Sequence, residues 1–83
     1  KPKIHVIRFP ASQWDDVTQN IQTFLLLKDD GYRVGDELNM QEYKGGEFTG
    51  GVIDAEITYM VNEHSGLVEG FCIAGIKVLR YSN

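Results

Sequence analysis

Apolar residues recur along the chain with the two-residue period of β-strands. Residues 3–9 are rich in Ile and Val and stop at Pro10, a pattern typical of a strand. Residues 37–43 and 52–61 alternate apolar and polar side chains, so we expect strands with one buried face and one exposed face. Residues 71–79 form a final apolar strand. The alternation within residues 52–61 assigns five residues to the apolar face: Ile53, Ala55, Ile57, Tyr59 and Val61.

The segment after the first strand has the features of a short helix. Ser12 occupies an N-cap position, and Asp15 follows three residues later as in a capping box. Three apolar residues at helical spacing predict the face that packs on the sheet: Trp14, Val17 and Ile21. We therefore expect a helix over residues 12–21.

A continuous apolar run marks one further strand, predicted over residues 22–28. Alternation cannot divide Leu25, Leu26 and Leu27 between two faces, so we expect both faces of this strand to be covered.

Glycine-rich and polar segments predict the remaining connections. Residues 44–51 contain four glycines and predict a loose hairpin connection, whereas residues 62–70 predict a connector with one helical turn around Leu67. These assignments describe one domain over residues 1–83. We expect a small α+β fold, a barrel of about five mostly antiparallel strands with one or two short helices.

The charges are unevenly distributed along the chain. The net charge is −4, which argues against a nonspecific nucleic-acid binder. However, all twelve carboxylates lie between Asp15 and Glu69, and both ends of the chain carry only cations. If the first and last strands are neighbours, a basic strip lies on an acidic body; otherwise these cations only solubilise strand edges.

The single cysteine and the two histidines limit the chemistry available. Cys72 lies in an apolar run, so we expect a packed thiol in a reducing, cytoplasmic setting. The chain lacks the closely spaced ligands of a zinc site, and we expect neither a metal nor a cofactor. No apolar run approaches the ~20 residues of a membrane span and no signal peptide is visible, so we expect no membrane partner.

An ordered set of short motifs over about 70 residues resembles the ASCH branch of the PUA-like superfamily. The motifs include Thr23-Phe24, Tyr32-x-Val34-Gly35-Asp36-x-Leu38, Phe48-Thr49-Gly50, Thr58-Tyr59 and Gly66-Leu67-x-x-Gly70-Phe71. The resemblance is to a small uncharacterised branch of phages and bacteria. It implies a PUA-like (ASCH) β-barrel associated with RNA and modified nucleosides.

The segment that lines the cleft in ASCH domains departs from the family pattern. The family reads Gly-x-Lys-x-x-Glu-x-Arg there, and this chain has Asn20, Gln22, Leu25 and Leu27. In acylcytidine-hydrolysing relatives the Lys falls on Gln22 and the hydroxyl residue on Leu25. A neutral amide is no proton-transfer base and leucine no nucleophile, so we expect no catalytic residue and no enzyme. A nucleoside amidohydrolase remains an alternative.

Polar positions shared with the family support binding instead. His5 and Tyr43 are the expected contacts to a base, with Tyr32 as another stacking candidate. Arg8 and Lys28 would neutralise phosphate, and Asp30 would orient Lys28. Single-stranded RNA or a modified nucleoside is the implied ligand. A simpler interpretation remains for His5, which would then only hydrogen-bond a neighbouring backbone carbonyl.

The first alternative to the binding module, ahead of the amidohydrolase, is a protein-interaction or adaptor domain of a prophage accessory protein. Here the strand with Leu25, Leu26 and Leu27 would present an apolar patch to a partner or a second copy.

Overall fold

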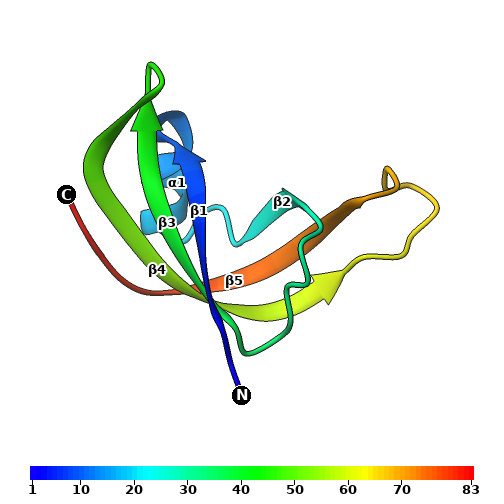
Figure 1. The fold of residues 1–83 in the computed structure, drawn as a ribbon. Helices are drawn as coiled ribbons and strands as arrows, with labels where there is room; N and C mark the ends of the chain where they lie inside the picture. The colour runs from blue at the N-terminus through cyan, green and yellow to red at the C-terminus, as the bar shows by residue number, and fades with distance from the viewer.

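A five-stranded mixed sheet, curled into a half-barrel, organises the chain in the computed structural model, which describes residues 1–83 (Figure 1). The strands are β1 (Ile4–Pro10), β2 (Phe24–Lys28), β3 (Glu37–Lys44), β4 (Glu47–Val61) and β5 (Phe71–Ser82). Between β1 and β2 lie a 3₁₀ turn, η1 (Ala11–Gln13), and the short helix α1 (Trp14–Thr18). The predicted small α+β fold with five strands is confirmed.

The strand order is β1-β3-β4-β5-β2, so β1 and β2 are the two edges of an open sheet. Only β1 and β3 pair in parallel, and the other three pairings are antiparallel. The first and last strands are therefore not neighbours, because β3 and β4 lie between them. The basic strip, which we expected only if the first and last strands were neighbours, does not form. The Arg80 guanidinium instead lies 3.0 Å from the Asp54 carboxylate and 3.6 Å from the Glu37 carboxylate.

The β3–β4 hairpin is tighter than the glycine content predicts. Only Gly45 and Gly46 form its turn, with φ of 62° and 82°, values that glycine adopts without strain. Gly50 and Gly51 lie within β4. The prediction of a loose connection over residues 44–51 was wrong, because the two-residue turn lets both strands extend to its ends.

Alternation along the strands builds the core on the inner face of the half-barrel. Leu38 and Met40 of β3 and Ile53, Ala55 and Ile57 of β4 are buried, as predicted. Tyr59 is 67% exposed, contrary to its predicted place on the apolar face. The pairing of β4 with β5 shifts between Ile57 and Tyr59, and this bulge turns the following side chains over. Met60 packs against the core in place of Tyr59.

The helix is shorter than predicted. Ser12 lies in η1 and provides no N-cap hydrogen bond, and α1 ends at Thr18. Asn20 adopts a left-handed φ of 65°, which turns the chain away before Ile21. Trp14 and Val17 are buried as predicted, but Ile21 is 69% exposed.

β2 has one covered face, not two. Leu25 is buried, with 4% exposure, and Leu27 packs against the core, whereas Leu26 between them is 62% exposed. An edge strand of a half-barrel meets the core on its inner side only. Residues 62–70, which connect β4 to β5, contain turns and no helix.

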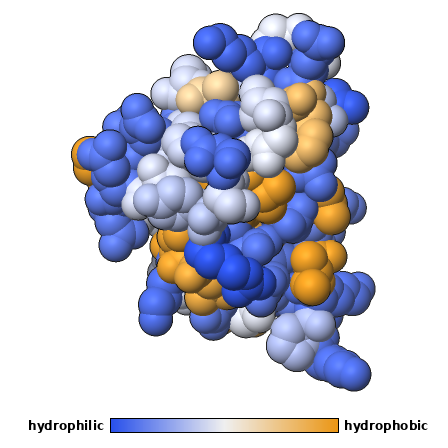
Figure 2. Space-filling model, turned by 90° about the vertical axis from the view of Figure 1, so that its left-hand side faces the viewer, coloured by the Kyte–Doolittle hydropathy of each residue, from blue (hydrophilic) through white to orange (hydrophobic).

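The outer side of β3, β4 and β5 carries polar contacts. Asn39 donates to Asp54 at 2.9 Å, and Gln41 donates to Asn39 at 3.2 Å. The side of the molecule seen in Figure 2 is largely hydrophilic, with separate apolar groups between the polar ones. No helix is long and apolar enough to cross a membrane.

Candidate functional site

A buried histidine–aspartate pair lies where β1 enters the sheet. His5 Nε2 lies 2.7 Å from Asp36 Oδ2, and the Asp36 residue is only 4% exposed. The His5 ring meets Tyr32 edge-on, with centroids 4.7 Å apart. His5 is therefore held by a carboxylate rather than by a backbone carbonyl, the simpler role considered from the sequence.

Asp36 accepts two further hydrogen bonds, from the backbone N–H groups of Lys3 (3.1 Å) and Arg33 (3.2 Å). The hydrogen bond from His5, followed by that from Lys3, lowers the pKa of the Asp36 carboxyl, because these donors favour its ionised form. Asp36 thus joins β1 to the turn before β3. The contacts of the His5–Asp36 pair therefore connect β1 to that turn.

Tyr32 stays a protonated phenol near neutral pH. Burial raises its pKa first, and the negative charge of Asp30 adds to the effect. The Tyr32 ring contacts the His5 ring edge-on. It is a partly buried aromatic that packs against the core.

Arg8 and Tyr43 meet on the opposite, outer side of the sheet. Strand alternation turns Arg8 away from the face that His5 occupies. The Arg8 guanidinium carbon lies 5.0 Å from the centroid of the Tyr43 ring, a cation–π contact. The Tyr43 ring lies 6.0 Å from that of Phe48, its cross-strand partner.

A hollow of about 400 Å³ adjoins this cluster. It is lined by Pro10, Ala11, Ser12, Tyr43, Lys44 and Gly45. Phe48 leaves 48% of its surface exposed beside it. We call Arg8, Tyr43, Lys44 and Phe48 the hairpin-tip site, because they lie at or near the turn between β3 and β4.

The five residues expected to form one cleft lie in different parts of the molecule. Arg8 and Tyr43 are together at the hairpin-tip site, and His5 is bound to Asp36 on the inner face. Lys28 ends β2, opposite Phe71 of β5. The structure has no ion pair between Lys28 and Asp30. No contact therefore supports the expected role of Asp30 in orienting Lys28.

The residues at the family's cleft positions have structural contacts here. Gln22 donates from Nε2 to Gln13 Oε1 (3.0 Å) and to the Phe24 carbonyl (2.9 Å), which fastens the helical segment to β2. Leu25 and Leu27 occupy the interior. Neither arrangement supplies a base or a nucleophile.

The sequence-based interpretation missed Phe48, Lys44 and Asp36. The first two follow from recognising Gly45-Gly46 as a two-residue hairpin turn, since that turn places Phe48 opposite Tyr43. Asp36 gave no such signal, because its partners are distant in the sequence. No group of three His, Cys, Asp or Glu side chains is placed to hold a metal ion.

The fold and these contacts define a small α+β half-barrel domain with an aromatic and cationic hairpin tip. Residues 4–76 match the family model described as "Domain of unknown function (DUF3850)". The chain belongs to this DUF3850 family. No curated protein matches the chain.

Proposed function

We propose that this domain is a PUA-like (ASCH) module that binds single-stranded RNA or a modified nucleoside at the hairpin-tip site, without catalysis. The observation that carries the proposal is the stacking of Arg8 on Tyr43, beside the exposed ring of Phe48. Alternating cations and exposed aromatics are the usual means of holding unpaired nucleotides. The proposed setting is the bacterial cytoplasm, where the domain acts either for the bacterium or for a phage that the bacterium carries.

Each side chain of the site has a role in this proposal. Tyr43 and Phe48 provide ring faces for a base, a contact worth ~1–3 kcal/mol per base. Arg8 and Lys44 neutralise phosphate. The adjoining hollow of about 400 Å³ falls in the size range of small-molecule sites and suits one nucleoside. Bases in a duplex are stacked and unavailable, so the target is single-stranded.

The acidic character of the chain limits the affinity. With a net charge of −4, binding depends on the local pair of cations rather than on a general basic surface. Two phosphate contacts predict a slope of about −1.4 for log K against log salt on a single strand. Binding is therefore expected to be modest and salt-sensitive.

Fluorescence anisotropy with a short labelled single-stranded RNA tests the proposal. Arg8→Ala and Tyr43→Ala are each expected to weaken binding about fivefold or more, and Arg8→Ala also flattens the salt dependence. Lys28→Ala is the matched control, an exposed cation at the other edge of the sheet, and should leave binding unchanged. Absence of salt-sensitive binding, or equal affinity of the Arg8→Ala and wild-type proteins, would refute the proposal.

Catalysis is left out because the chain offers no base or nucleophile where acylcytidine-hydrolysing relatives have theirs. The Gln22 amide is engaged by Gln13 and Phe24, and Leu25 is buried. Incubation with acylated cytidine should therefore release no cytidine above the uncatalysed rate. Release at an enzymatic rate would instead favour the amidohydrolase.

A further inference from the structure

The edge strand β2 has backbone groups without partners. Thr23 accepts from Ile76 N–H and Gly70 accepts from Asp29 N–H, each at 2.9 Å. Because hydrogen-bonded pairs alternate in an antiparallel ladder, residues 23, 25, 27 and 29 face β5. Phe24, Leu26 and Lys28 therefore direct their N–H and C=O groups to the free edge. Only the Phe24 carbonyl has a partner there, the Gln22 side chain.

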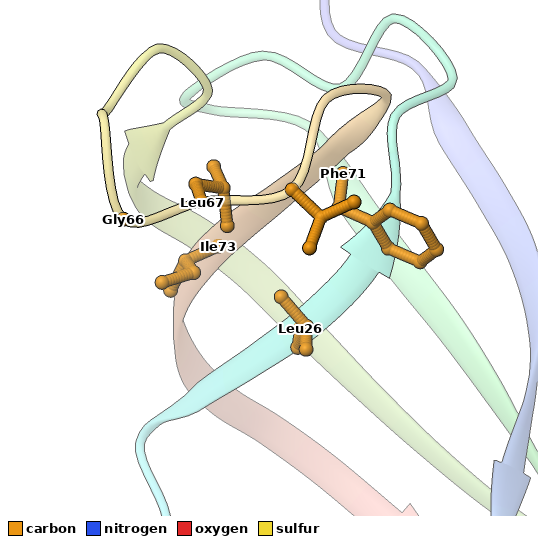
Figure 3. A pocket seen from close by; sticks show the side chains of 6 residues that line it. Leu26, Gly66, Leu67, Phe71 and Ile73 are labelled. Carbon is orange, nitrogen blue, oxygen red and sulfur yellow. The ribbon is translucent and has the colours of Figure 1, made fainter.

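Apolar side chains surround this free edge on the outer side of the sheet. We call five exposed residues the outer apolar patch: Phe24, Leu26, Tyr59, Val68 and Phe71. The β-ladders place Leu26 beside Ile73 and put Phe24 and Tyr59 on either side of Gly75. A hollow of about 390 Å³ opens next to Leu26, lined also by Gly66, Leu67, Val68, Phe71 and Ile73 (Figure 3).

We infer that a second copy of this chain pairs its β2 antiparallel with β2 of the first copy, next to Phe24 and Leu26 of the patch. The two-fold axis passes beside Leu26, so the two sheets become one continuous sheet. In this register Leu26 faces Leu26, and Phe24 faces Lys28 of the other copy. All three residues with outward backbone groups then gain partners.

The patch lies on the outer face of the sheet, beside the proposed pairing edge. The five exposed side chains offer about 500 Å² of apolar surface per copy, since a large aromatic side chain alone presents ~150–250 Å² when fully accessible. Pairing along β2 covers the sides of Phe24 and Leu26 that face the second copy, whereas Tyr59, on β4, keeps its exposed surface. A patch of this size falls within the ~300–600 Å² of the largest apolar patch on a typical monomer.

The charge pattern along β2 is compatible with its own reversed copy. The proposed register places Asp29 opposite Thr23 and Asp30 opposite Gln22, so no like charges face each other. Lys28 lies beside the Phe24 ring of the second copy, where a cation–π contact is available. The strand carries no proline, bulge or inward charge, so its short length and Lys28 are the features that protect this edge.

The opposite edge, β1, exposes the aliphatic residues Ile4 and Val6, but the strand beside it is polar on the outer side. Its neighbour β3 presents Glu37, Asn39 and Gln41 on the outer side, and β1 itself carries Arg8 there. An apolar partner would have to desolvate these groups. β2 is therefore the edge that favours self-association, and it is separate from the hairpin-tip site.

Sedimentation velocity on the full chain tests the inference over a range from about 1 µM to several hundred µM. The expected result is a shift from 9.4 kDa to twice that mass as concentration rises. Leu26→Lys should abolish the shift. Leu26→Pro should also abolish it, because the lost N–H points to the free edge and not to β5.

Val6→Lys is the matched control, since Val6 is an exposed aliphatic residue on the other edge strand. It should dimerise like the wild type. Far-UV circular dichroism verifies that each variant is folded. If Leu26→Pro is unfolded, the test rests on Leu26→Lys alone. A wild type that stays monomeric at every concentration overturns the inference, as does a dimer broken by Val6→Lys but not by Leu26→Lys.

A monomer that binds an unrelated extended apolar peptide would overturn it as well, and would assign the β2 edge to a strand of another protein. RNA binding by Leu26→Lys should be unchanged, which separates this test from that of the proposed function.

Discussion

The Nε2 atom of His5 lies 2.7 Å from Oδ2 of Asp36, and this contact fastens the edge strand β1 to the turn that begins β3. Asp36 also contacts β4 through its backbone, because Ile57 N–H donates a hydrogen bond to the Asp36 carbonyl at 2.8 Å. Asp36 is therefore the point at which three strands of the half-barrel are held together.

We predict that Asp36→Asn lowers the thermal midpoint by several degrees. An amide keeps the size of the side chain, but its NH₂ group replaces one of the two accepting oxygens. Either the bond from Lys3 to Oδ1 or the bonds from His5 and Arg33 to Oδ2 are therefore lost. Lys28→Ala, which removes an exposed side chain without a side-chain partner, is the control and should change the midpoint little. Equal midpoints for Asp36→Asn and wild type would contradict a structural role for this carboxylate.

The lowered pKa of Asp36 also predicts a pH dependence. The folded carboxyl has a pKa below its ordinary value of 3.8, so its contribution to stability is complete above that value. As pH falls through the lowered pKa, the unfolded state binds the proton first and the contribution is lost. Urea unfolding between about pH 2 and pH 6 should therefore show a smaller loss of stability in Asp36→Asn than in wild type. If the unfolding free energies of wild type and Asp36→Asn fall in parallel with pH, other carboxyl groups dominate the pH dependence of stability.

The two faces of β2 predict opposite responses to truncation. Leu25→Ala should cost about 2–5 kcal/mol of unfolding free energy, because the side chain is buried and leaves a cavity. Leu26→Ala should cost less than about 0.5 kcal/mol at micromolar protein concentration, since its side chain is exposed in the monomer. Urea denaturation measures both, and a reversed order would mean that the strand register is shifted by one residue.

A glycine in β4 is required by close packing. A Cβ atom at Gly51 would lie 3.1 Å from the Trp14 ring and 2.6 Å from Glu42 Oε1. Gly51→Ala should therefore destabilise the protein by about 1–3 kcal/mol and change the tryptophan fluorescence of the native state. Gly66→Ala is the matched control, because its new atom would meet only the exposed His64 ring, which can move. If Gly51→Ala left the free energy of unfolding unchanged, the Trp14 ring would have room to shift.

The thiol of Cys72 should be unreactive in the folded protein. Cys72 is fully buried, and burial, with a smaller contribution from Asp29, raises its pKa. A disulfide reagent at about pH 8 should label it only after denaturant is added. As a control, Ser82→Cys in a Cys72→Ala background places a thiol at an exposed position and should react at once. Rapid labelling of native Cys72 would indicate that β5 opens locally.

The strands could be predicted from the sequence because alternation is a local property. Residues 37–43 and 52–61 carry their pattern within themselves, and the structure places β3 and β4 there. The predicted helix failed at Ile21 because its end depends on the left-handed turn at Asn20. Tyr59 was assigned to the wrong face because a bulge is defined by two strands, and its partner β5 lies more than ten residues away.

The candidate site shows the same division. Arg8 and Tyr43 could be chosen as residues of interest from their types, but their contact depends on the parallel pairing of β1 with β3. His5 could be chosen too, yet the sequence gave no indication of its contact with Asp36, 31 residues away.

The sequence alone determined that this chain forms one small β-rich domain, which segments become strands, and that Cys72 lies in an apolar segment, because these properties follow from the order of neighbouring residues. Only the tertiary structure decided that the sheet stays open, that β2 is an edge with Leu26 exposed, and that His5 and Arg8 point to opposite sides. These outcomes depend on which strand lies beside which, and strand order is set by contacts between residues that are far apart in the chain.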